Sequence, residues 1–106
     1  MLRKAFLMKI KPGMIAEYEK RHNPIWPELH RILKTHGISN YSIFHHEKTN
    51  QLFGYVEIES EAKLADLEEN EVCGKWWLEM KKYLVSESED SPRAIEDPMG
   101  EVFHIE

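Results

Sequence analysis

The sequence predicts an α+β protein in which an antiparallel sheet carries helices on one face. Three observations support this fold class. Segments 40–46 and 51–59 alternate apolar and polar residues around the short polar loop 47–50, which is typical of a β-hairpin. Helical patterns, with apolar residues three or four positions apart, stand on both sides of this hairpin. Short β-prone segments, 3–10 and 102–105, lie near the two ends of the chain.

The first strand leads into a helix that ends on a histidine. Residues 3–10 form an apolar run edged by cations, and Lys11-Pro12-Gly13 is a turn sequence. The following pattern predicts a helix over 14–22. Tyr18 and His22 stand four residues apart, so on a helix both side chains lie on one face, one turn apart.

A corner containing two prolines separates this helix from the next. Asn23-Pro24 ends the first helix, because proline disfavours the α conformation of the residue before it. Pro27 fits the first turn of a second helix that begins near residues 23–26. Gly37 marks its end, since glycine accepts the left-handed conformation there. The second helix has a clear amphipathic stripe, formed by Ile25, Leu29, Ile32, Leu33 and His36.

The second half of the chain repeats the order of helix and strand. Ser60 is a good N-cap for a helix that turns Leu64 and Leu67 inward. A further helical stripe steps by four residues through Val72, Trp76, Met80 and Leu84. We expect residues 85–101 to form a long acidic surface loop and residues 102–105 to form the last strand. The resulting order, βαββαβ, is that of the ferredoxin-like fold, with helices on one face of the sheet.

Size and composition limit the possible functions. The 106 residues suit one domain, 1–106, and a sheet covered on one face often buries the other by dimerising. A net charge of −5 without a basic patch argues against nucleic-acid binding. No segment reaches the roughly 20 apolar residues that cross a membrane, and Lys9 interrupts the N-terminal apolar run too early for a signal peptide. The single cysteine, Cys73, fits a reducing compartment, so we expect a cytoplasmic protein.

Several kinds of site lack their sequence signals. The five glycines stand far apart, so no phosphate-binding loop is present. The ligand spacings of structural zinc sites are absent, and for His22, His45 and His104 a structural role is the better interpretation than metal binding. Cys73 lies on an apolar helix face, where an inert packed thiol is expected.

His22 has two interpretations that residue patterns alone leave balanced. A histidine at a helix C-terminus interacts favourably with the helix dipole, which is a purely structural role. However, Tyr18, Asn23 and Trp26 surround it with more aromatic and hydrogen-bonding groups than a corner needs. Imidazole also exchanges protons near neutral pH.

The aromatic residues outside this corner also have two interpretations. Trp76 and Trp77 lie about 100° apart on a helix, so both rings can border one inner region without stacking on each other. Core filling is the simpler interpretation, and a platform for a sugar or a flat ligand is the functional one. Tyr41, near the start of a strand, either packs on the sheet or holds its hydroxyl at the mouth of a cleft.

The chain resembles the L-rhamnose mutarotase family, small sugar epimerases of the dimeric ferredoxin-like group, also described as a dimeric α+β barrel. The segments that carry the resemblance run in order along nearly the whole chain. They are RKAF, YEKRHNPIWPEL, HG followed by NYSIF, LFGYVEIES, VCGKWWLEM and EVFHI. RHNPIWPEL and the double tryptophan are the most specific of these motifs, whereas loop 85–100 matches least.

The resemblance implies a function and a set of site residues. It implies interconversion of the α and β anomers of L-rhamnose by a homodimer without a cofactor. His22, the histidine of the RHN motif, would be the proton donor. The sugar would be held by Tyr18, Tyr41, Trp76 and Trp77. The second group that moves a proton stays open among Tyr18, another histidine and water.

Two other functions compete with this one. Cofactor-independent monooxygenases and haem-degrading enzymes share the fold, and some use Asn, Trp and His around a flat aromatic ligand. These residue types are present here as Asn23, as Trp26 or Trp76, and as His22. The other competitor is a dimeric sensor that binds a sugar without accelerating anomer exchange.

Overall fold

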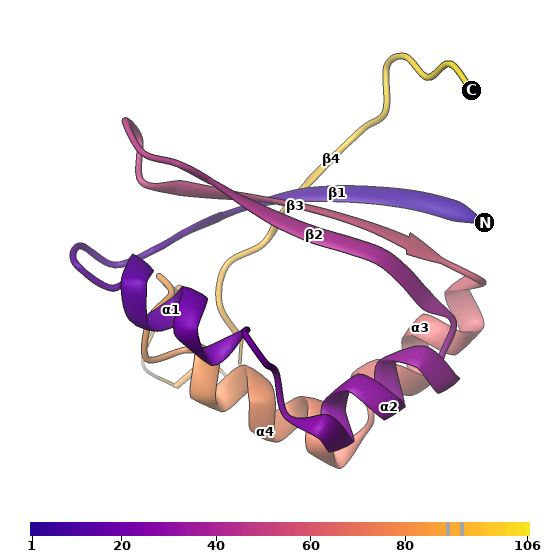
Figure 1. Ribbon diagram of the computed structural model, residues 1–106, viewed down its shortest axis with the longest axis horizontal. Helices are drawn as coiled ribbons and strands as arrows, with labels where there is room; N and C mark the ends of the chain where they lie inside the picture. Colours follow the sequence, from indigo (N-terminus) through magenta and orange to yellow (C-terminus); the bar gives the residue numbers. More distant parts are fainter. Residues whose placement is uncertain (89, 92) are drawn as a thin grey trace.

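The protein has two layers, a twisted antiparallel sheet and a layer of helices that covers one of its faces (Figure 1). The computed structural model describes residues 1–88, 90–91 and 93–106. Among these residues, no helix combines the length and apolar character that a membrane crossing requires. The α+β fold class and the placement of helices on one face are confirmed.

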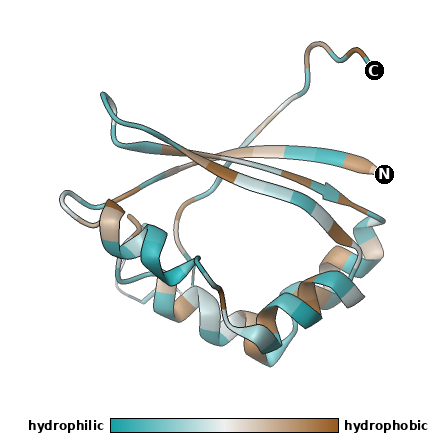
Figure 2. Ribbon diagram, in the orientation of Figure 1, coloured by the Kyte–Doolittle hydropathy of each residue, from teal (hydrophilic) through white to brown (hydrophobic). Residues whose placement is uncertain are grey.

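The sheet has the strand order β2-β3-β1-β4. Strands β1 and β3 pair along their whole length, from Leu2 opposite Ile58 to Lys9 opposite Gln51. Strands β2 and β3 form the predicted hairpin around the hydrophilic loop 47–50 (Figure 2). The strands are β1 (Leu2–Lys9), β2 (Ile38–His46), β3 (Gln51–Ile58) and β4 (Asp97–Met99).

The helical layer contains α1 (Ile15–Arg21), α2 (Pro27–Thr35), α3 (Glu61–Glu68) and α4 (Glu71–Met80). Helix α2 begins with Pro27, slightly later than predicted, because Trp26 is its N-cap and proline is well suited to the first helical position. Gly37 follows α2 with φ +77°, as its predicted stop role requires. The Ser60 side chain accepts a hydrogen bond from the Lys63 amide, so the predicted cap of α3 is confirmed.

The last strand lies earlier in the chain than predicted. The prediction of a strand at 102–105 is wrong, since β4 is Asp97–Met99, which lies inside the segment expected to be a loop. Pro98 pairs opposite Phe6 at the sheet edge, where a missing backbone donor is tolerated. Segment 101–106 leaves both layers (Figure 1) and is exposed, and among the described residues it pairs with no strand.

An irregularity in β2 determines which of its side chains face the helices. Between Ser39 and Ser42, β2 has one residue more than β3, which is a β-bulge. Asn40 sits there with φ 47°, a left-handed conformation that asparagine accepts more readily than most residues, and its side-chain amide donates to Glu57 at 3.0 Å. Because of this extra residue, the side chains after the bulge alternate out of step with those before it. Tyr41 therefore points toward the helical layer.

The core consists of two apolar clusters between the sheet and the helices. One lies around Met8, Leu52 and Trp76, and the other around Ile58 and Leu67. Phe6, Leu33 and Trp77 pack against both clusters. Full burial of an aliphatic side chain such as Leu52 or Ile58 contributes about 1.5–3 kcal/mol. The candidate site lies where the two clusters meet.

Candidate active site

Two connected cavities separate the sheet from the helices. The outer one, a cleft of about 940 Å³, opens beside β2, α1 and α2. The inner one has a volume of about 200 Å³, roughly seven times the ~30 Å³ that a water molecule takes up in the liquid. The two share a wall that includes Tyr18, His22, Tyr41 and Trp76. Trp77 lines the inner cavity, so the structure brings all five residues implied by the sequence motifs around one enclosed space.

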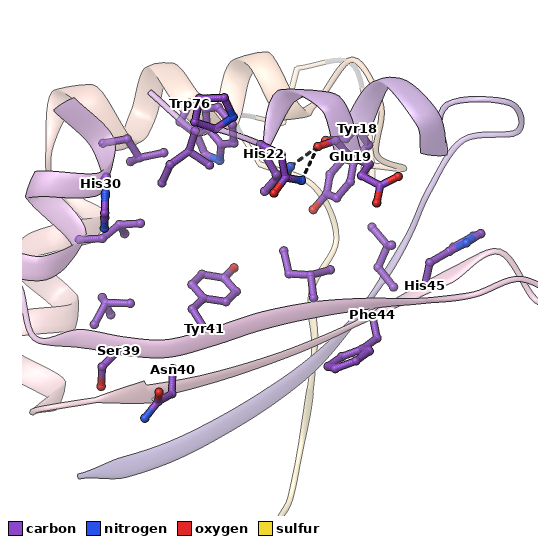
Figure 3. Close-up of a pocket in the computed structure, with 18 of the residues that line it drawn as sticks. Tyr18, Glu19, His22, His30, Ser39, Asn40, Tyr41, Phe44, His45 and Trp76 are labelled. Carbon is purple, nitrogen blue, oxygen red and sulfur yellow. Dashed lines mark hydrogen bonds between the residues drawn. The ribbon is translucent and has the colours of Figure 1, made fainter. Parts of the chain in front are cut away.

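His22 is positioned by the end of α1, of which it is the C-cap. Its Nδ1 lies 2.8 Å from the Tyr18 carbonyl oxygen (Figure 3). A carbonyl only accepts hydrogen bonds, so Nδ1 carries a hydrogen and donates it, which leaves Nε2 as the nitrogen that exchanges protons. Burial lowers the pKa of His22, and the bond to Tyr18 opposes part of this shift. The neutral imidazole therefore dominates at neutral pH.

Tyr18 and Tyr41 approach His22 from the two layers of the molecule. The ring centroids of Tyr18 and His22 are 4.4 Å apart, as expected from their spacing on one helix face. Tyr41 rises from β2 toward the helical layer (Figure 3), its ring lies with its centroid 6.2 Å from that of Phe6, and 45% of the residue is exposed. Burial raises the pKa of both phenols well above the usual value, with the Glu96 carboxylate adding to the rise. Both phenols therefore stay protonated at neutral pH.

The tryptophans form the apolar wall of the site. Trp76 is buried in the core and also meets the edge of His22, with ring centroids 5.2 Å apart. Core filling and cavity lining are thus combined in one residue. Trp26 packs at right angles against Trp76 with centroids 5.0 Å apart. Trp77 lines the inner cavity as well. The central carbon of the Arg93 guanidinium lies 4.0 Å from the centroid of its ring.

Sequence patterns missed the charged part of the inner cavity. Arg93 and Glu96 belong to the segment predicted to be a solvated loop, yet both line this cavity. No periodic pattern connects them to the rest of the site. The acidic composition of the loop suggested only a hydrated surface, and the contact between Arg93 and Trp77 spans two different elements of the fold.

The described residues show no group of three or more His, Cys, Asp or Glu side chains that could hold a metal ion. Burial raises the pKa of the Cys73 thiol to about 11. The thiol therefore stays protonated and is a poor nucleophile.

Fold and site together define a class: a ferredoxin-like α+β protein with a small pocket lined by phenols, an imidazole and indole faces, with charged side chains in one part of its lining. Such a pocket suits a small, uncharged polar ligand. The structure of a dimeric ferredoxin-like protein from an uncultured marine organism matches with a TM-score of 0.62 at 13% identity, over 97% of this chain and 94% of that one. This match supports the fold alone.

The particular family follows from closer matches. The family model for L-rhamnose mutarotase matches residues 3–105. An L-rhamnose mutarotase of Opitutus terrae is 49% identical and one of Pectobacterium atrosepticum is 47% identical, each over the full length of both chains. The crystal structure of the L-rhamnose mutarotase from Formosa agariphila matches with a TM-score of 0.85 at 37% identity, over all of both chains. The chain belongs to the L-rhamnose mutarotase family, as its motifs predicted.

Proposed function

We propose that this protein interconverts the α and β anomers of L-rhamnose, with His22 as the proton donor. Family membership over the full chain is the observation that carries the proposal. It favours a sugar isomerase over a haem-binding or monooxygenase protein of the same fold. The geometry supports it further, because the inner cavity has room for one pyranose and places an imidazole beside phenols and indoles.

The chemistry requires one proton to move between two oxygens of the sugar. Opening the ring takes a proton from the anomeric hydroxyl and adds one to the ring oxygen, while the bond between C1 and the ring oxygen breaks. Neutral His22 accepts the first proton at Nε2, and the resulting imidazolium donates it to the ring oxygen. Both oxygens are bonded to C1, so one nitrogen can serve both. The aldehyde then rotates, and reclosure reverses the steps.

The other four residues hold the sugar during this cycle. The phenols of Tyr18 and Tyr41 keep their protons, so they donate hydrogen bonds to sugar oxygens and do not act as bases. This leaves His22 as the shuttle, without a proton taken up by Tyr18. Trp76 and Trp77 offer apolar ring faces to the C–H groups and the methyl group of a deoxy sugar.

The decisive experiment measures anomer exchange directly. Proton NMR saturation transfer between the anomers of L-rhamnose is recorded with and without protein. We expect the exchange rate to rise with protein concentration. A sensor that only binds the sugar would shift or broaden its resonances without faster exchange. No acceleration at near-stoichiometric protein would refute the proposed function.

We further propose that two copies associate through the sheet face that the helices leave open. Phe44 and Phe53 pair across β2 and β3 on this face and are 65% and 42% exposed. Exposed apolar side chains also occur in the C-terminal segment, at Val102, Phe103 and Ile105. The marine protein that shares this fold is a dimeric ferredoxin-like protein. We therefore propose that a second copy of this chain covers the open face of the sheet.

Light scattering tests this association. We expect the mass of a dimer for the parent protein and of a monomer for Phe44→Glu. Leu78→Glu is the matched control, since Leu78 is an exposed apolar residue on the helical side, 57% exposed. A monomeric parent protein, or a Phe44→Glu variant that remains dimeric, would contradict the proposed interface.

We also propose that residues 1–106 act as one domain in the cytoplasm. The buried unpaired thiol of Cys73 supports a reducing compartment. A single cooperative unfolding transition would agree with one domain, and two separated transitions would contradict it. Cell fractionation tests the location: recovery in a secreted or membrane fraction would contradict it.

A further inference from the structure

The inner cavity has a charged end built on Arg93. The carbon at the centre of its guanidinium lies 4.0 Å from the centroid of the Trp77 ring. Its Nη1 lies 2.9 Å from an oxygen of Glu68, and its Nη2 lies 3.3 Å from an oxygen of Glu96. The guanidinium is therefore held by an indole face and two carboxylates. Arg93, Glu68 and Glu96 all line the inner cavity.

Glu96 is directed toward this cavity by the start of β4. Pro98 pairs opposite Phe6, and Phe6 lies on the helix-facing side of the sheet, since its ring fills the space beside Gly54. Glu96 immediately precedes this strand and lines the inner cavity, with its side chain 36% exposed. Tyr18 and Tyr41 line the same cavity as Glu96, and the Glu96 charge adds to the raised pKa of both phenols.

This pair supplies chemistry that the other site residues lack. The five residues already described present phenols, indoles and a neutral imidazole, so none of them bears a charge. A pyranose carries neighbouring hydroxyl groups that both donate and accept. A carboxylate accepts two such hydrogen bonds, and a guanidinium has five N–H donors, so two ion pairs leave donors for a ligand. Hydrogen bonds to charged groups are about twice as strong as neutral ones.

We propose that Arg93 and Glu96 bind the sugar, with Glu96 accepting hydrogen bonds from neighbouring ring hydroxyl groups and Arg93 donating to their oxygens. This inference rests on the proposed function and extends it from the reacting centre to the charged part of the pocket. The ligand class is a neutral pyranose with a pair of adjacent free hydroxyl groups. Glu68 and Trp77 are positioning residues here, because they hold Arg93.

The test separates binding from chemistry. Glu96→Gln keeps the size of the side chain and removes its charge, and Arg93→Met removes the guanidinium while retaining an apolar stem over Trp77. We expect KM for L-rhamnose to rise about tenfold to a hundredfold in each variant, the range of a lost hydrogen bond to a charged group, with a smaller change in kcat. Circular dichroism checks that each variant is folded.

Glu59→Gln is the matched control. Glu59 is a carboxylate paired with Lys63 at 2.8 Å, its side chain is 55% exposed, and it is outside the lining of the two cavities. We expect it to leave KM unchanged. A KM within twofold of the parent value for Glu96→Gln would overturn the proposal. So would a lower kcat at constant KM, which would make Glu96 a proton carrier.

Calorimetric titration with L-rhamnose keeps this test independent of catalysis. If the parent protein binds the sugar but does not accelerate exchange, the proposed function fails. The affinities of the variants then still test whether Arg93 and Glu96 bind the sugar. Affinity lost in Glu96→Gln and Arg93→Met but retained in Glu59→Gln supports the sugar-binding pair. Equal affinity in all four proteins refutes it.

Discussion

Helices α1 and α2 both end on a histidine held in the same way. His22 and His36 are the two C-cap residues, and both side chains are partly buried. In each, Nδ1 lies 2.8 Å from the carbonyl oxygen four residues earlier, that of Tyr18 or Ile32. For Tyr18 this bond satisfies a carbonyl at a helix end, where backbone acceptors lack helical partners, whereas the Ile32 carbonyl also accepts from the His36 amide and the Thr35 hydroxyl.

The two histidines differ in what surrounds the rest of the ring. His22 meets the rings of Tyr18 and Trp76 and lines both cavities, whereas His36 lies beside the Gly37 turn and lines neither. The shared bond is a structural role that any histidine in this position can fill. A candidate for proton transfer is therefore identified by the cavity and the aromatic side chains around its ring. The capping hydrogen bond does not identify it, because both histidines make that bond.

The largest expected effect is on catalysis. His22→Ala should lower the protein-dependent rate of anomer exchange by about 10²–10⁴-fold, the usual contribution of a positioned acid or base. His36→Ala should leave this rate within twofold. Saturation-transfer NMR measures both. Full activity in His22→Ala, or an equal loss in His36→Ala, would show that the proton donor is misassigned.

The next effect is on the pH dependence. The shuttle begins with neutral His22, and burial lowers its pKa from the ordinary 6.5. We expect kcat/KM, corrected for the spontaneous reaction, to be flat above pH 6.5. It should fall only as the pH drops through the lowered pKa. A rate that instead decreases as the pH rises from 6 to 8 would mean that the protonated ring starts the cycle.

Local patterns predicted the elements that have a regular period. The hairpin of β2 and β3 was visible as alternation, and the closeness of Tyr18 and His22 followed from their spacing on one helix turn. The bulge at Asn40 was not visible, because its extra residue is defined only by pairing with β3. That bulge turns Tyr41 into the cavity. The part of the site on β2 therefore depends on register as well as composition.

Strand β4 and the Arg93 contacts depend on tertiary structure. Residues 97–99 contain a proline and have no periodic pattern, and they form a strand because the edge of β1 is open to them. Residues 102–105 have the composition of a strand but pair with no strand in the part of the chain that the structure describes. Arg93 reaches Trp77 and Glu68 across separate elements. Propensity describes neighbours in sequence, so it missed these contacts.

A smaller effect is expected at the phenol of Tyr41. Tyr41→Phe should raise KM for L-rhamnose about threefold to tenfold, the range of one neutral hydrogen bond, without loss of stability. Tyr55→Phe is the matched control on the same sheet, because Tyr55 bonds to Glu57 and does not line either cavity. Steady-state exchange rates at several sugar concentrations measure KM. Equal values for the two variants would remove Tyr41 from the binding site.

The smallest expected effect concerns stability, where the two histidines should resemble each other. At pH 7.5, His22→Ala and His36→Ala should each lower the free energy of unfolding by about 0.5–1.5 kcal/mol, the net contribution of one hydrogen bond. The pKa of His22 is lowered in the folded state, so its contribution is fully present above the unfolded pKa of about 6.5 and is lost as the pH falls through the folded pKa.

The cost of His22→Ala should therefore shrink between pH 7.5 and pH 5, because the parent protein must place a cation in a partly buried site. Urea unfolding of both variants and the parent at the two pH values measures this, with His36→Ala giving the cost of the capping bond at pH 7.5. A cost for His22→Ala that grows as the pH falls would mean that the folded protein stabilises the imidazolium. The aromatic cavity would then favour the charged ring, and the cycle would begin from the protonated donor.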